Sequence, residues 1–148
     1  MNFLEIIFYF FSAILVLSAL GVITSRNPVH AALLLVLAFF TAAGLWLLLG
    51  AEFLAITLVL VYVGAVMVLF LFVVMMLDIN LDRLREGYWK WFPFGGLLAV
   101  VMAAEVVMVL INKNFSIDQM PAPPPHASDY SNTKELGMLL YTEYVYPF

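Results

Sequence analysis

Cysteine is missing from this 148-residue chain, and charged side chains make up only 11% of it. A chain without cysteine holds no disulfide, no iron–sulfur cluster and no thiol nucleophile. The sequence also lacks the GxGxxG and GxxxxGK(S/T) patterns that bind dinucleotides and nucleotide phosphates. The net charge of −4 is spread thinly, and no basic patch predicts binding to nucleic acid.

Histidine is scarce as well, since His30 and His126 are the only two. They belong to different loops of the expected fold, whereas a metal site needs three or four ligands gathered in one place. We therefore expect no metal site and interpret His30 as an interfacial packing residue. No serine–histidine–acid set predicts nucleophilic catalysis.

Apolar residues dominate what is present. They form 66% of the sequence, and the mean hydropathy of +1.08 is too high for a water-soluble domain. Four apolar runs each approach the ~20 residues that cross a bilayer as a helix; they are Ile6–Ile23, Ala31–Ala51, Phe53–Leu77 and Trp91–Ile111. Because a helix satisfies its own backbone groups in lipid, the sequence predicts an all-α, polytopic bundle of four transmembrane helices, near 3–23, 28–50, 52–77 and 92–112.

The polar breaks predict where these helices begin. Asn27 is expected to cap the second helix, with Pro28 in its first turn. The short break Gly50-Ala51-Glu52 predicts that the second and third helices are antiparallel neighbours. Glu52 would begin the third helix, where the helix dipole favours an anion.

Basic residues predict the orientation in the membrane. The first and third loops hold four of them, Arg26, Arg83, Arg85 and Lys90, whereas the opposite side holds Lys113 and Lys134. By the positive-inside rule, the first and third loops face the cytoplasm and the N-terminus lies outside.

The C-terminal part differs from the rest. Residues 1–112 contain the four helices, 113–132 form a proline-rich external linker, and 133–148 begin a new apolar rise. Asn132 and Glu135 resemble a capping box for a short helix. We expect that helix to lead towards a fifth transmembrane helix in the complete gene product.

Two acids have two interpretations each. Glu105 is the only acid inside an apolar run, and it is either a proton-relay group or a side chain that snorkels to the nearby helix end. Glu52 is either a solvated helix cap or an acid at a channel mouth.

Tyr62 and Gly64 interrupt the longest apolar run. As a regular helix, Phe53–Leu77 would be about 38 Å long, whereas the hydrocarbon core is ~30 Å thick. The helix must therefore tilt or become irregular. Either Gly64 packs against a neighbouring helix while Tyr62 makes one hydrogen bond, or the pair permits a π-bulge, a distortion that is frequent at functional sites.

Three motifs are recognisable, namely NPVH at 27–30, GAEF at 50–53, and YVGA at 62–65 running into VLF at 68–70. With them, residues 27–78 closely resemble subunit J of bacterial respiratory complex I, the counterpart of chain 6 of the mitochondrial proton-pumping NADH:quinone oxidoreductase. The resemblance is weaker over 3–23 and slight over 82–133.

That resemblance implies five helices, a place in the membrane arm of the complex in the bacterial inner (plasma) membrane, and no cofactor in this chain. FMN, iron–sulfur clusters and quinone would belong to partner subunits. The partners in the bilayer would be the quinone-site subunit, small three-helix subunits and antiporter-like subunits.

The resemblance also implies a π-bulge in the third helix, at Tyr62, Val63, Gly64, Ala65 and Val66, whose relaxation to α-helix is thought to connect or break a water path. Some family members carry a glutamate one turn before the tyrosine. Leu58 occupies that position here, so that Glu52 is the nearest acid.

The sequence thus predicts a non-catalytic subunit of an H⁺-translocating NADH:quinone oxidoreductase that couples quinone reduction to proton translocation through its third helix. Tyr62, Gly64, Glu52 and Glu105 are the candidate coupling residues. A purely structural assembly subunit and a small ion-transporter subunit are the alternatives. A transporter often shows two similar halves, and no internal repeat relates 3–49 to 53–111.

Overall fold

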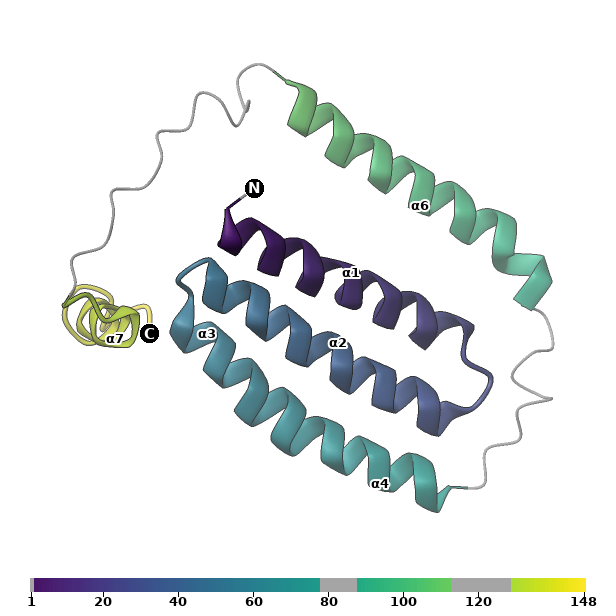
Figure 1. Ribbon diagram of the computed structural model, residues 1–148, viewed down its shortest axis with the longest axis horizontal. Helices are drawn as coiled ribbons and strands as arrows, with labels where there is room; N and C mark the ends of the chain where they lie inside the picture. The colour runs from purple at the N-terminus through teal and green to yellow at the C-terminus, as the bar shows by residue number, and fades with distance from the viewer. Residues whose placement is uncertain (1, 78–87, 113–128) are drawn as a thin grey trace. The chain divides into compact units, whose positions relative to one another are not determined.

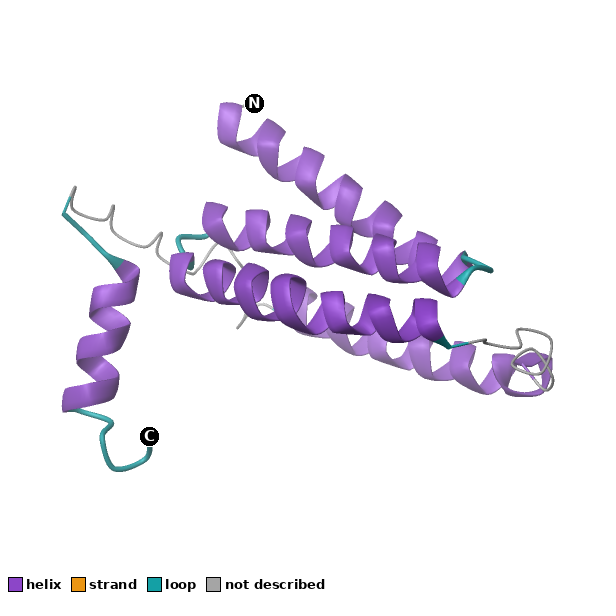
Figure 2. Cartoon of the chain, turned by 90° about the horizontal axis from the view of Figure 1, so that it is seen from below, coloured by secondary structure: helices purple, strands orange, loops and turns teal. Residues whose placement is uncertain are grey.

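The computed structural model describes residues 2–77, 88–112 and 129–148, which form helices and loops without a β-strand among them (Figure 2). These residues fall into two compact units. One contains α1, α2, α3, η1, α4 and α7, and the other contains α6.

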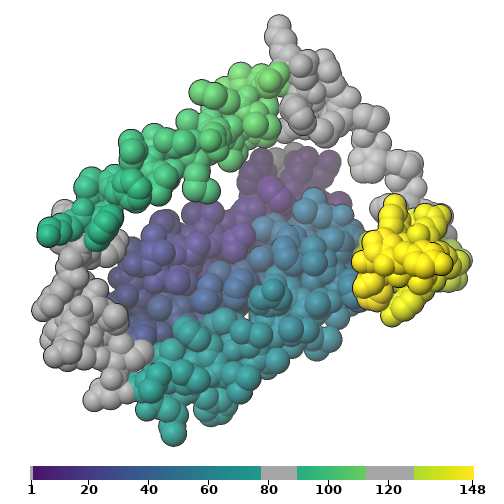
Figure 3. Space-filling view, turned by 180° about the vertical axis from the view of Figure 1, so that it is seen from behind, coloured from purple at the N-terminus to yellow at the C-terminus, as the bar shows by residue number. Residues whose placement is uncertain are grey.

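Three membrane-length passes form most of the first unit. The first pass is α1 (Phe3–Thr24) and the second is α2 (Pro28–Leu48). The third pass consists of three consecutive segments, α3 (Glu52–Thr57), the π-helix η1 (Leu58–Met67) and α4 (Val68–Met76). These passes lie side by side in chain order, with α2 in contact with both of the others (Figures 1 and 3).

The fourth pass is α6, which runs from Tyr88 to Ile111. It begins four residues before the expected residue 92 and contains Pro93 near its start. Pro93 is the sixth residue of α6, so its missing N–H removes one bond of the helical ladder, close behind the first four N–H groups, which have no intrahelical acceptor. By length and hydropathy, α1, α2, the third pass and Lys90–Ile111 can each cross a membrane, which confirms the predicted all-α architecture with four spans.

The connections between the passes follow their local sequence. The Asn27 Oδ1 atom accepts a hydrogen bond of 2.9 Å from the Val29 N–H, and Pro28 is the first residue of α2, as predicted. After α2, Gly50 adopts a φ of 77°. Its N–H donates to the Leu47 carbonyl, and the Ala51 N–H donates to the Trp46 carbonyl, both at 3.0 Å. This pair of bonds is a Schellman motif, which ends α2 and turns the chain into α3.

Small residues allow the helices to approach one another. Ala43 and Ala55 are almost fully buried and form, with Leu58, the contact between α2 and the third pass. Between α1 and α2, a Cβ atom on Gly44 would lie 2.7 Å from the Phe11 ring, so the missing side chain makes room for that ring. Close packing of this kind replaces the hydrophobic effect, which does not drive helices together in lipid.

The short helix α7 spans Asn132–Thr142. The Ser131 side chain caps it by accepting a hydrogen bond of 3.4 Å from the Lys134 N–H. The predicted capping box of Asn132 with Glu135 is therefore wrong by one residue, because Asn132 is already helical and its side chain bonds elsewhere. The proline-rich segment lies outside the described residues up to position 128.

Candidate functional site

The π-helix η1 is the most unusual feature of the third pass. It contains ten residues, and all five residues expected to be irregular, from Tyr62 to Val66, belong to it. In a π-helix each N–H bonds to the carbonyl five residues earlier, and most natural examples are single-turn bulges. Leu58 and Met67, at the two ends of η1, are buried, whereas Tyr62 and Gly64 are exposed in this chain.

Tyr62 contacts the second pass through its ring. The rings of Tyr62 and Phe39 have centroids 5.9 Å apart and are tilted by 60°. About half of Tyr62 is exposed, at 49%. Its hydroxyl has no hydrogen-bond partner among the described residues.

Gly64 has no neighbouring helix against it in the described part of the chain. A Cβ atom built on Gly64 would meet only the Val59 carbonyl oxygen, at 3.4 Å. Val59 is the residue whose carbonyl an i→i−5 bond from Gly64 would use. The described residues thus connect Gly64 with the local π geometry, and they show no close helix packing at this position.

Glu52 is the first residue of α3 and is exposed. Beside it, the Phe53 N–H donates a hydrogen bond of 3.3 Å to the Asn132 Oδ1 atom of α7. A hydrogen bond to the Glu135 side chain raises the pKa of Tyr130, and the nearby charge of Glu52 acts in the same direction. The beginning of α7 and the beginning of α3 are therefore neighbours. Asn132 was not among the predicted site residues.

The structure does not gather the predicted site residues into one cluster. Tyr62 and Gly64 share η1, but Glu52 lies ten residues before Tyr62, which is more than two helical turns. Glu105 is an exposed residue of α6, six residues before the end of that helix, and it belongs to the other unit. No group of three or more possible metal ligands occurs among the described residues.

Together these features define a multi-pass α-helical membrane protein with a π-helix inside one pass. Residues 18–148 match the family described as NADH-ubiquinone/plastoquinone oxidoreductase chain 6. The chain belongs to this family.

Individual relatives agree with the family match. The chain is 49% identical over 144 residues to the NADH-quinone oxidoreductase subunit J of Rhodobacter capsulatus, covering 95% of this chain and 70% of that protein. It is 41% identical to the subunit J of Rickettsia bellii, with 98% and 71% covered. It is 38% identical to the NADH-ubiquinone oxidoreductase chain 6 of Cyanidium caldarium, with 97% and 74% covered.

Proposed function

We propose that this chain is a membrane-arm subunit of a proton-translocating NADH:quinone oxidoreductase in the inner (plasma) membrane of a bacterium, and that η1 couples quinone reduction to proton movement. The observation that carries the proposal is the ten-residue π-helix around Tyr62 and Gly64, within a pass whose only charged residue is its first, Glu52. Family membership supports the assignment to the enzyme. FMN, the iron–sulfur clusters and the quinone belong to partner subunits.

The coupling step is a change of hydrogen bonding along η1. When i→i−5 bonds convert to i→i−4 bonds, each residue removed from a bulge rotates the adjoining helix by about 100°. This rotation moves Tyr62 into or out of the face of the helix at which its hydroxyl holds a water molecule. Tyr62 has the only polar side chain between Leu58 and Met67, so no other side chain of η1 can hold water there. Gly64 lowers the cost of this change because it lacks a Cβ atom.

The energies suit a switch. Two conformations exchange under the influence of a partner only if they differ by a few kcal/mol. A π-helix forfeits the better geometry of α-helical bonds. At Gly64 the missing Cβ atom lowers the steric cost of passing between the two forms.

Two variants test the proposal. Gly64→Val should add a β-branched side chain beside the Val59 carbonyl, stiffen the backbone there and hold η1 in one state. Tyr62→Phe should remove the hydroxyl without altering the ring contact with Phe39. Both are expected to assemble normally and to oxidise NADH with an artificial acceptor at the wild-type rate. Quinone-linked turnover or protons moved per electron should fall, as measured in membrane vesicles.

Gly96→Val is the matched control, because Gly96 lies in the regular helix α6 and a Cβ atom there meets nothing within 4 Å. It is expected to leave coupling intact. The rival function is a purely structural subunit. Normal proton pumping by both the Gly64 and the Tyr62 variants would favour that rival and overturn the coupling role.

A further inference from the structure

The ring that Tyr62 contacts belongs to Phe39 of α2, a residue that the proposed coupling step does not use. The two ring centroids are 5.9 Å apart and the planes are tilted by 60°. This separation is within the range of about 4.5–7 Å at which aromatic rings attract each other, and such a pair contributes stability beyond the area that it buries. The contact therefore favours the form of η1 that places Tyr62 against α2.

Phe39 is itself held in place. It is half-buried and packs against the cluster of Ala43, Ala55 and Leu58, which joins α2 to the beginning of the third pass. Ala55 and Leu58 are buried in this contact, so a rotation of α3 or of the start of η1 would break its packing. A change of hydrogen bonding along η1 is therefore taken up beyond Leu58, in the part that carries Tyr62.

The contact between the two rings depends on the hydrogen bonding of η1. Conversion of i→i−5 bonds to i→i−4 bonds turns the residues beyond them by up to about 100° relative to Leu58. A rotation of this size moves a side chain from one face of a helix to another. The Tyr62 ring would then leave Phe39, so the ring pair is specific to the π-helical form.

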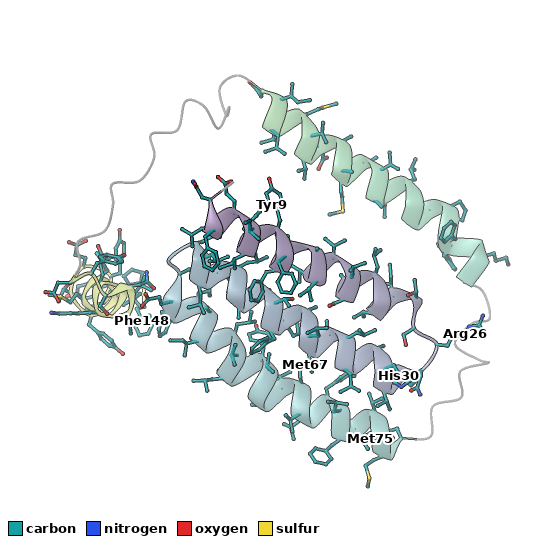
Figure 4. The ribbon with its side chains drawn as sticks, viewed as in Figure 1. Tyr9, Arg26, His30, Met67, Met75 and Phe148 are labelled. Carbon is teal, nitrogen blue, oxygen red and sulfur yellow. The ribbon has the colours of Figure 1, made fainter. Side chains whose placement is uncertain are left out.

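Met67, at the other end of η1, also lies on the side of the third pass that faces α2 (Figure 4), and it is buried. An unbranched methionine side chain can follow a displaced backbone by changing its rotamer. Two aromatic rings attract each other only in a limited set of arrangements. The pair of Phe39 and Tyr62 thus distinguishes the two forms of η1 more sharply than Met67 does.

We propose that Phe39 is a positioning residue of the coupling step, whose ring holds Tyr62 against α2 and so favours the π-helical form of η1. This inference rests on the proposed function of η1. Loss of the ring pair should shift the ratio of the α-helical to the π-helical form about two- to tenfold towards the α-helix. Gly64 lowers the cost of passing between the two forms, whereas Phe39 decides which of them is populated.

The experiment measures both forms of η1 in the purified complex, reconstituted in lipid. Nitroxide labels are attached at Leu47 of α2 and at Leu69 of α4, two residues that are exposed in this chain. The labels are joined through p-acetylphenylalanine, so that the thiols of partner subunits do not react. Double electron–electron resonance gives the distance between them, and a rotation of α4 against α2 appears as a second distance.

Phe39→Leu should raise the proportion of the second distance in the resting complex about two- to tenfold relative to the first. Phe39→Tyr retains a ring and should resemble the wild type. Phe39→Met also removes the ring, and it replaces Phe39→Leu if that variant does not assemble. Phe40→Leu is the matched control, because Phe40 is the next residue of α2 and is more than half exposed. It should leave the two distances unchanged.

A sample of the wild type frozen while it oxidises NADH separates this inference from the proposed function. The wild type should gain the second distance during turnover. If it does, but resting Phe39→Leu and Phe39→Met resemble the resting wild type, the role of Phe39 is overturned and the coupling role of η1 stands. An equal shift in Phe40→Leu would also overturn it, since any loss of a ring from α2 would then suffice. A single distance in every variant and during turnover would overturn both proposals.

Discussion

Gly50 is a residue whose backbone conformation decides what can replace it. Its φ of 77° lies in the left-handed region, where a Cβ atom costs about 1–2 kcal/mol. Gly50→Ala should therefore destabilise the chain by that amount. Gly96→Ala should instead stabilise it by up to about 1 kcal/mol, because Gly96 is inside a regular helix. Thermal unfolding of the detergent-purified chain tests whether the two substitutions have opposite signs.

Gly44 is constrained by packing rather than by its dihedral angles. Because a Cβ atom there would lie 2.7 Å from the Phe11 Cε1 atom, Gly44→Val should separate α1 from α2 at a cost of about 1–3 kcal/mol. Phe11→Leu, which removes the ring, should reduce the damage when the two changes are combined. A double-mutant cycle measures this coupling. Purely additive effects would show that the ring does not occupy the space at Gly44.

At the scale of elements, the contact between α7 and α3 depends on one side chain. Asn132→Ala removes the acceptor of the Phe53 N–H bond, and a net loss of about 0.5–1.5 kcal/mol is expected. Lys134 is already exposed, but a released α7 unfolds more readily and should be cleaved there by trypsin several times faster, as followed by the mass of the fragments. Thr133→Ala is the control on the same helix. If both variants are cleaved at the same rate, Asn132 does not hold α7.

In the third pass, some features could be predicted from the sequence and others could not. The apolar run predicts its two ends within a residue, because length and hydropathy are local properties. The ring contact between Tyr62 and Phe39 could also have been predicted from the sequence. Phe39 is eleven residues before Gly50, and Tyr62 is eleven residues after Ala51. An antiparallel pair brings such positions together. The extent of η1 over ten residues was not predicted, because no residue type marks where i→i−5 bonding begins or ends.

At the scale of the whole molecule, the lack of cysteine makes orientation measurable without a background signal. Cysteines introduced at Ser25 and Arg85 should react with an impermeant thiol reagent from the cytoplasm, and one at Ser128 from outside. Basic residues of the first and third loops are the physical cause, since they resist translocation. The reverse labelling pattern contradicts the predicted topology.

The sequence by itself determined that the chain lies in lipid rather than in water, and it determined the number of passes, most of their boundaries and the family. Each of these depends on local composition or on short motifs. Only the tertiary structure showed that Asn132 bonds to α3, that the Phe11 ring occupies the space beside Gly44, and that the Leu34 side chain rests against Gly21. These facts depend on which atoms of distant residues meet. Helices of uniform hydrophobicity offer little amphipathic pattern from which to predict their contacting faces, so that shape, set by glycine, alanine and ring positions, decides how they pack.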